Sequence, residues 1–216
     1  PLAASDRVRS ALLSALSHDL RRPLAAATAS VSGLRADRKS SLSDRDREEL
    51  LATADESLGT RTTLITDLLD VTRLQAGVLA VSPVARDPAD VIAPAPDELG
   101  LGPDQIELDL DTKVPLALAH PVLLQRVLVN LLVNGTRHAP PDTRVRITTS
   151  TFARRIEIRI IDHGPGIPPE RRDDIFVPFQ RLGDTDNTTG LGLGLALSKG
   201  FIEGMDGTLT LEDTPG

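Results

Sequence analysis

The feature that most constrains this chain is a pair of long amphipathic segments at its beginning. The first is expected to be helical from Ser5 to Arg35, because apolar residues recur in it every three or four positions. The polar turn from Asp37 to Ser43 leads into a second such segment, which starts with a capping box at Ser43 and Asp46 and ends at Gly77. Helices joined by so short a turn form an antiparallel hairpin. Because a hairpin cannot enclose a core, the pattern predicts dimerisation into a four-helix bundle, with packing onto the rest of the chain as the alternative.

The pattern changes after Gly77, and the predicted domain boundary lies between Gly77 and Pro83. A helix is expected to start at Asp87-Pro88 and to be interrupted by Pro94 and Pro96. Further helices are expected over residues 121–138, 168–175 and 191–203. The expected strands cover residues 78–84, 106–110, 116–119, 144–151, 156–161 and 208–211. The strands over 144–151 and 156–161 are expected to form a hairpin with a turn near Ala153-Arg154. The second half therefore reads as an α/β sandwich.

Composition excludes several classes of protein. The 216 residues include no cysteine, so disulfides and thiolate metal sites are excluded, and the four histidines (18, 120, 138 and 163) are not at zinc-ligand spacing. A net charge of −7 argues against nucleic acid as a direct partner. No apolar run reaches membrane-spanning length and no signal peptide opens the chain. Both ends are expected to be cut from a longer protein.

His18 is a candidate nucleophile on the first helix. It lies two residues from both Leu16 and Leu20 of the apolar stripe, so it sits about 160–200° around the helix from that stripe and faces solvent. An exposed histidine beside a carboxylate, here Asp19, can act as a nucleophile or a base. Pro23 lacks the N–H that would bond the Asp19 carbonyl, so the helix is expected to loosen there. The alternative is an ordinary surface histidine.

Asn130, Asn134 and Arg137 fall within a narrow arc of the 121–138 helix. Amides on an otherwise apolar helix cost free energy unless they have partners. Amide oxygens are hard ligands suited to Mg²⁺, with phosphate oxygens and water completing the coordination, and Arg137 can balance phosphate charge. The alternative is a pair of core asparagines that bond the backbone.

Two further stretches suit a nucleotide. Asp162 at a strand end can accept a hydrogen bond from an exocyclic amine such as that of adenine, and Gly164 and Gly166 let the backbone approach a flat ring. The alternating glycines at 190, 192 and 194 expose backbone N–H groups at the start of a helix, which favours phosphate. The spacing fits neither a Walker A loop nor a dinucleotide fingerprint. Phe176 and Phe179 either contact a ligand or pack a loop onto the core.

Together these stretches resemble the H, N, G1, F and G2 boxes of bacterial two-component sensor histidine kinases, in the same order and over essentially the whole chain. The sequence around the phosphoacceptor, and the Asp/Pro-rich segment after residue 84, look closest to the potassium-responsive, KdpD-like branch. The motifs that carry the resemblance are His18-Asp19-Leu20-Arg21, Asn130…Asn134, Asp162-x-Gly164-x-Gly166, Phe176-x-x-Phe179 and Gly190-x-Gly192-x-Gly194.

The resemblance implies a dimerisation and histidine-phosphotransfer hairpin over residues 1–77 and a Bergerat-type ATP-binding α/β sandwich over residues 78–216. His18 would be phosphorylated by ATP with help from Asp19, and the phosphoryl group would pass to a response regulator. Asn134 and Asn130 would hold Mg²⁺. The implied ATP-binding residues, partly under a lid over residues 167–190, are Asn130, Asn134, Arg137, His138, Asp162, Gly164, Gly166, Ile167, Phe179, Arg181, Gly190, Gly192 and Gly194. The chain would be a cytoplasmic part of a homodimer anchored in the membrane by N-terminal regions.

Four departures from the family pattern matter. Arg22 stands where Thr or Asn often supports dephosphorylation of the regulator, so phosphatase activity is expected to be weak or absent. Gly135 stands where alanine is commoner, and it should cost about 1 kcal/mol of helix stability. His120 replaces the Asp that often caps the following helix, which predicts a weaker cap. The chain also stops before the closing strand that such domains usually have.

Two other functions stay open on the sequence. A catalytically inactive, kinase-like scaffold would keep the fold and signal by conformation alone. An ATPase of the same superfamily would use a glutamate in the position of Asn130 to activate water, and an amide cannot act as that base.

Overall fold

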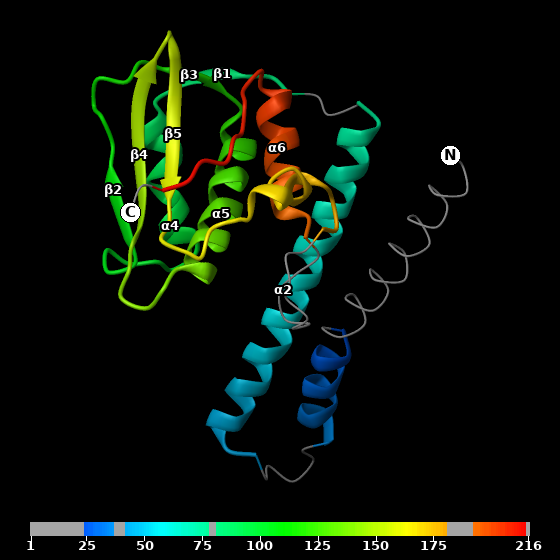
Figure 1. Ribbon diagram of the computed structural model, residues 1–216. Helices are drawn as coiled ribbons and strands as arrows, with labels where there is room; N and C mark the ends of the chain where they lie inside the picture. The colour runs from blue at the N-terminus through cyan, green and yellow to red at the C-terminus, as the bar shows by residue number, and fades with distance from the viewer. Residues whose placement is uncertain (1–23, 37–41, 78–80, 181–191, 215–216) are drawn as a thin grey trace. The chain divides into compact units, whose positions relative to one another are not determined.

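The computed structural model describes residues 24–36, 42–77, 81–180 and 192–214 (Figure 1). Its contacts divide the chain into two compact units, with the main boundary between Thr72 and Arg73. The first unit is helical and the second is α/β, which confirms the predicted succession of the two. The domain limits at residues 77 and 78 stay a prediction.

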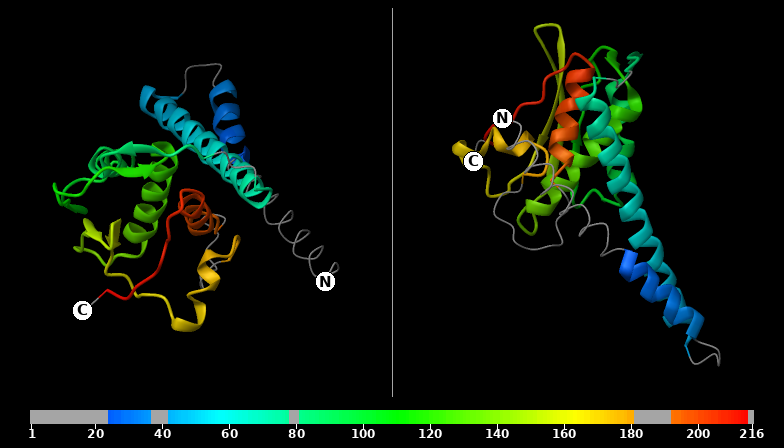
Figure 2. Two further views of the ribbon diagram at one scale, coloured as in Figure 1. Left: turned by 90° about the horizontal axis from the view of Figure 1, so that it is seen from above. Right: turned by 90° about the vertical axis from the view of Figure 1, so that its right-hand side faces the viewer.

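The helical unit contains a helix over residues 24–36 and the 32-residue helix α2 (Asp44–Gln75). The predicted capping box is present, because Ser43 Oγ accepts a hydrogen bond from the backbone N of Asp46 at 3.1 Å and Asp46 Oδ2 accepts one from the backbone N of Ser43 at 3.1 Å. Helix α2 ends before Gly77, whose φ of +64° is typical of a C-cap glycine. The two helices lie side by side in Figures 1 and 2, which confirms the hairpin.

Much of the apolar surface of this hairpin is uncovered. The two helices approach closely at Gly33, where a Cβ atom would lie 3.5 Å from Leu50 Cδ1, and small side chains such as Ala27 and Ala54 are buried. Larger apolar side chains are 42–54% exposed, namely Leu24, Val31, Leu51, Leu58, Ile65 and Leu69. One hairpin therefore leaves much of its apolar stripe in solvent, as its sequence predicts.

The α/β unit contains a three-stranded sheet in the order β2 (Ile106–Asp109), β4 (Val145–Phe152), β5 (Arg155–Ile161). Strands β2 and β4 are parallel, and β4 and β5 form the predicted antiparallel hairpin. A second, two-stranded sheet pairs β1 (Val84–Arg86) with β3 (Ala117–Ala119). The helices are α3 (Pro88–Ile92), α4 (Pro94–Glu98), α5 (Pro121–His138) and α6 (Gly194–Gly204). Figures 1 and 2 show α4, α5 and α6 on one side of the larger sheet.

The core lies between the sheet and these helices. Val145 and Ile147 on the inner face of β4 are buried with Leu128 and Leu132 of α5 and with Ile92 of α3. Alternation along β4 sends every second side chain inward, as the sequence of this strand predicts.

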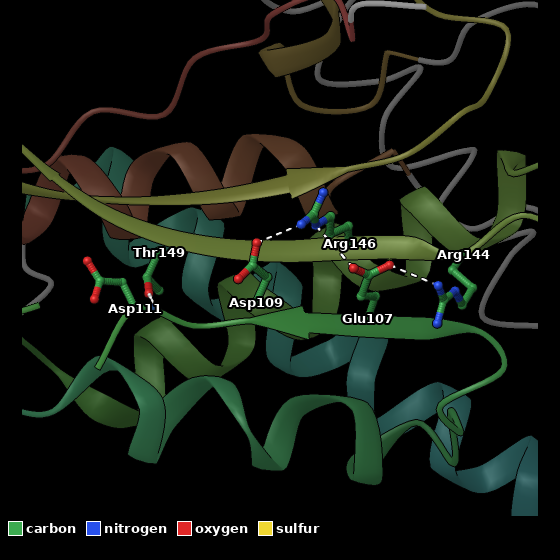
Figure 3. Close-up of polar contacts among 6 residues, drawn as sticks. All are labelled: Glu107, Asp109, Asp111, Arg144, Arg146 and Thr149. Atoms are coloured by element: carbon green, nitrogen blue, oxygen red, sulfur yellow. Dashed lines mark hydrogen bonds and ion pairs between the residues drawn. The ribbon is translucent and has the colours of Figure 1, made fainter. Parts of the chain in front are cut away.

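The opposite face of the sheet is polar and faces solvent. Arg146 Nη2 lies 2.7 Å from Asp109 Oδ2, and Arg144 Nη2 lies 3.1 Å from Glu107 Oε2 (Figure 3). These side chains are 37–58% exposed, so each ion pair contributes little to stability. They indicate that no further layer covers this face within the described chain.

Two predicted strands differ in the structure. The strand expected over residues 78–84 is instead β1 at Val84–Arg86, and residues 81–83 are not in a strand. Pro83 has no N–H to donate to a ladder, and β3 offers only three partner residues. The strand expected over residues 208–211 is absent, because its alternating side chains have no neighbouring described strand to pair with.

Two predicted helices also differ. The helix expected over residues 168–175 is a pair of 3₁₀ turns, η1 (Pro169–Arg171) and η2 (Asp174–Phe176), because two consecutive prolines remove N–H donors from its start. Helix α6 begins at Gly194 rather than at residue 191. Gly192 has a φ of +67° and its carbonyl accepts a hydrogen bond from Phe179, so it lies outside the helix.

Candidate functional site

Helix α5 carries the central polar side chains of the candidate site. His120 caps it, because His120 Nδ1 accepts a hydrogen bond from the backbone N of Leu123 at 3.4 Å, and Pro121 occupies the first helical turn. The cap that the sequence predicts to be weak is therefore present as one long hydrogen bond. Because α5 buries its apolar face in the core, Asn130 and Asn134 lie together on a different, half-buried face.

Asn130 joins α5 to the start of α6. Its Nδ2 atom donates to the carbonyl of Gly194 at 3.4 Å and to Ser198 Oγ at 3.5 Å. Ser198 is fully buried, and a Cβ atom on Gly194 would lie 3.7 Å from Asn130 Cγ. The amide nitrogen of Asn130 is therefore directed to α6, and its Oδ1 atom accepts no hydrogen bond from the residues that the structure describes.

Asn134 makes no side-chain hydrogen bond to any described residue, although it is half-buried. Two amide oxygens on one helical face are thus free to bind a ligand. The described residues contain no cluster of three or more His, Cys, Asp or Glu side chains that could hold a metal ion by themselves. This donor set fits Mg²⁺ brought in with phosphate oxygens, which needs only one or two protein ligands.

Gly135 brings the end of α5 against the sheet. It is buried, and a Cβ atom on it would lie 3.4 Å from Val145 Cγ2 and 3.6 Å from Asp162 Cβ. These are ordinary van der Waals distances, so glycine is not sterically required at this position. The contact places the Asn134 turn of α5 beside Asp162 at the end of β5.

Asp162 opens a tight turn that leads away from β5. Its Oδ1 atom accepts a hydrogen bond from the backbone N of Gly164 at 2.8 Å, and its Oδ2 atom has no partner among the described residues. A Cβ atom on Gly164 would lie 3.0 Å from the backbone oxygen of His138, the last residue of α5. Gly166 has a φ of +72° and open space around its Cα. The turn therefore presents a free carboxylate oxygen and a bare backbone next to the end of α5.

The two phenylalanines have different surroundings. Lys199 Nζ of α6 lies 4.9 Å from the centre of the Phe176 ring, so Phe176 packs the 3₁₀ turns onto α6. Phe179 has a φ of +67°, and its backbone N donates to the carbonyl of Gly192 at 3.0 Å. A Cβ atom on Gly192 would lie 2.6 Å from the backbone oxygen of Gln180. For Phe176 the structure favours packing over ligand contact.

The structure brings Asn130, Asn134, Gly135, Asp162, Gly164 and Gly194 into neighbouring positions within the α/β unit. Arg137 and His138 are exposed in the last turn of α5. Gly166 and Ile167 lie in the turn that follows Asp162, and Phe179 is joined to Gly192 by a backbone hydrogen bond. His18, Asp19, Arg22, Arg181 and Gly190 lie outside the described residues.

The sequence did not single out three residues that contact the site. Ser198 is a buried hydroxyl on an otherwise apolar stretch of α6, and that contrast could have drawn attention to it. Arg172 and Thr214 bond the backbone of the Asp162 turn, and nothing in their local sequence predicts these contacts.

Comparison with known protein families gives two matches. Residues 8–77 match the His Kinase A (phospho-acceptor) domain, HisKA. Residues 119–216 match HATPase_c, described as histidine kinase-, DNA gyrase B- and HSP90-like ATPase. The matches fall on the helical hairpin and on the part of the α/β unit that contains Asn130, Asp162 and Gly194.

Comparison with individual proteins agrees. The chain is 54% identical over 220 residues to the Sensor protein KdpD of Rathayibacter rathayi, and 43% identical over 223 residues to that of Mycobacterium tuberculosis H37Rv. It is covered completely in both matches but spans only about a quarter of each relative (25% and 26%).

The solved structure of the Acinetobacter baumannii histidine kinase AdeS has the same fold, with a TM-score of 0.63 at 22% identity over 86% of each chain.

Within the residues that the structure describes, no helix is long and apolar enough to cross a membrane.

Proposed function

Because the chain belongs to the two-component sensor histidine kinase family and is KdpD-like, we propose that it is the catalytic core of such a kinase. It moves the γ-phosphoryl group of ATP onto His18 and then onto an aspartate in the receiver domain of a response regulator. The observation that supports this most strongly is the pair of amide oxygens on the half-buried face of α5, at Asn130 and Asn134, which accept no hydrogen bond from a described residue. Asn130 lies beside Gly194, and the next turn of α5 lies beside Asp162.

The α/β unit binds the nucleotide in this proposal. Asp162 accepts a hydrogen bond from the adenine amine through its free Oδ2 atom, and the backbone at Gly164 and Gly166 lies against the ring. The glycines at 190, 192 and 194 receive the phosphates at the N-terminus of α6. The other residues that we assign to ATP are Arg137, His138, Ile167, Phe179 and Arg181.

We assign Mg²⁺ to Asn134 and Asn130, whose amide oxygens are hard ligands. When bound there, the ion offsets the negative charge of the phosphates during transfer. The contribution of the chain is to hold both amides on one face of a helix whose other face is fixed in the core.

The helical hairpin supplies the acceptor. A ring nitrogen of His18 forms a bond to the γ-phosphorus, the bond from that phosphorus to the β–γ bridging oxygen breaks, and ADP leaves with the electron pair. Asp19 holds the other ring nitrogen by a hydrogen bond and so orients the imidazole.

We also propose that the chain acts as a homodimer through the hairpin. The exposed apolar side chains of α2, among them Leu51, Leu58 and Ile65, then become buried in a four-helix bundle. In the whole protein, N-terminal regions would anchor this core to the cytoplasmic side of the bacterial membrane.

Incubation with γ-labelled ATP and Mg²⁺ separates this function from its alternatives. A kinase transfers acid-labile, base-stable label to the chain, and the label is lost in His18→Gln. An ATPase of the same superfamily releases free phosphate without labelling the chain, and a scaffold does neither. Label that persists in His18→Gln would contradict the proposal.

A further inference from the structure

The turn from Asp162 to Ile167 is connected at both ends to residues 213 and 214, directly at its start and through Arg172 at its end. At its start, Thr214 Oγ1 donates to the carbonyl of Asp162 at 3.1 Å. At its end, Arg172 Nε donates to the carbonyl of Ile167 at 3.3 Å, and Arg172 Nη2 donates to Asp213 Oδ1 at 2.5 Å. Figure 1 shows residues 207–214 in red, running from α6 toward the end of β5.

The turn fixes its own shape only in part. Pro165 restricts one φ angle, but the turn also contains two glycines, one of them Gly166 with a φ of +72° and no atom within 4 Å of an added Cβ. Its internal side-chain hydrogen bond joins Asp162 Oδ1 to the backbone N of Gly164. Glycines lose more conformational entropy than other residues when a loop is ordered, so contacts from outside the turn set its geometry.

Arg172 is the side chain that makes this connection. Its guanidinium has donors in a fixed fork, which lets one side chain bond a carbonyl and a carboxylate at once. The ion pair alone would matter little, because Asp213 is 74% exposed. The bond to Ile167 is what links that pair to the turn, and Arg172 is the less exposed partner at 32%.

We propose that Arg172 is a positioning residue for the adenine end of the nucleotide site, acting with Asp213 and Thr214. Arg172 does not touch the nucleotide. It holds the carbonyl of Ile167, and through Asp213 and Thr214 the carbonyl of Asp162, so that the free Asp162 carboxylate oxygen and the glycine backbone keep a fixed spacing. This inference rests on the proposed function, because it assigns this turn to the base of ATP.

Nucleotide binding to the 216-residue chain tests the inference by isothermal titration calorimetry with ATP and with ADP. Arg172→Met should raise the Kd of both nucleotides about three- to tenfold, the loss expected for one or two hydrogen bonds. The factor should be the same for both, since the turn contacts the base and not the γ-phosphate. Once ATP is saturating, the rate of labelling should stay within about twofold of the unsubstituted chain, because the phosphates are held elsewhere.

Arg171→Met is the matched control. Arg171 is the neighbouring arginine, and its Nε atom pairs with Asp174 Oδ2 at 3.1 Å within the same pair of 3₁₀ turns. Neither of these two residues bonds the Asp162 turn or residues 213 and 214. Arg171→Met should therefore leave both Kd values within about twofold, as is usual for a surface substitution.

Asp213→Asn and Thr214→Val provide a second route that keeps Arg172 in place. Each should weaken ATP and ADP equally, and Asp213→Asn combined with Arg172→Met should weaken binding less than the product of the single effects. Both residues are exposed, so these two variants test the inference if circular dichroism shows that Arg172→Met does not fold.

Equal Kd values for the Arg172→Met and Arg171→Met chains would overturn the inference, and so would a loss confined to ATP or a fall in labelling at saturating ATP with unchanged Kd. If Arg172→Met does not fold, unchanged Kd values in both Asp213→Asn and Thr214→Val would overturn it. If the unsubstituted chain bound no nucleotide at all, the proposed function would fail first. The two failures are therefore distinguishable.

Discussion

The amide Nδ2 of Asn130 in α5 donates a hydrogen bond to the carbonyl of Gly194, the first residue of α6, at 3.4 Å. Its neighbour on the same face, Asn134, has no such bond to a described residue. One asparagine of the pair therefore contributes to the fold as well as to the site, whereas the other is available to the ligand alone.

This difference separates two alanine variants. Asn134→Ala should leave the free energy of unfolding within about 0.5 kcal/mol, because it breaks no described hydrogen bond. Asn130→Ala should lower it by about 0.5–1 kcal/mol, because it removes the bonds to Gly194 and Ser198. Both should reduce phosphorylation of the chain at least about a hundredfold through loss of a metal ligand. Urea unfolding and a labelling time course measure the two effects, and equal stability losses would contradict the distinction.

Gly135→Ala should stabilise the α/β unit by up to about 1 kcal/mol, because alanine is the better helix former. The new methyl group would meet Val145 at 3.4 Å, an ordinary contact distance. Urea unfolding measures the gain. Gly164→Ala is the contrasting variant, since its Cβ would lie 2.9 Å from Asp162 Oδ1 and 3.0 Å from the His138 carbonyl, and it should be destabilising. A loss of stability in Gly135→Ala would show that this part of the core cannot accept a methyl group.

The glycines at 192 and 194 should respond differently to alanine. At Gly192 a Cβ atom would lie 2.6 Å from the Gln180 carbonyl, and φ is +67°, so Gly192→Ala should cost about 1–3 kcal/mol. At Gly194, the first residue of α6, the nearest atom would be 3.7 Å away, so Gly194→Ala should leave stability unchanged or slightly higher. Thermal unfolding of the two variants without nucleotide measures this. The same Tm for both would contradict the close contact at Gly192.

Arg22 leads to a prediction about dephosphorylation of the response regulator. It lies four residues after His18, where family members often carry Thr or Asn, so the chain should dephosphorylate its regulator slowly and Arg22→Thr should raise that rate. Release of phosphate from purified phospho-regulator measures it. Brisk and equal rates in both chains would contradict the prediction.

Local patterns predicted the elements whose signals are complete within a few residues. The capping box at Ser43 and the Pro121 helix start formed as expected, because their hydrogen bonds join neighbours in the sequence. The turn at Ala153-Arg154 was placed correctly as well. Both residues adopt positive φ values (48° and 63°) without glycine or asparagine, because the pairing of β4 with β5 imposes the turn.

Features that depend on residues far apart in the chain could not be predicted from the sequence. Residues 208–211 alternate like a strand but have no described strand to pair with. The residues that follow, Asp213 and Thr214, are held by side-chain contacts instead. Those contacts join residues 41 and 52 positions apart, from Arg172 to Asp213 and from Asp162 to Thr214. The motifs thus identified the side chains of the candidate site, whereas the residues that hold them in place could be found only in the structure.

In the proposed mechanism, ATP phosphorylates His18. The most direct measurement is mass spectrometry at neutral to basic pH of the chain after incubation with ATP and Mg²⁺, with digestion to place the added group. We expect one phosphoryl group on the peptide that contains His18, and none in His18→Gln, which should still bind ADP as the unsubstituted chain does. A phosphoryl group on another residue, or an unmodified chain that still binds and hydrolyses ATP, would contradict it.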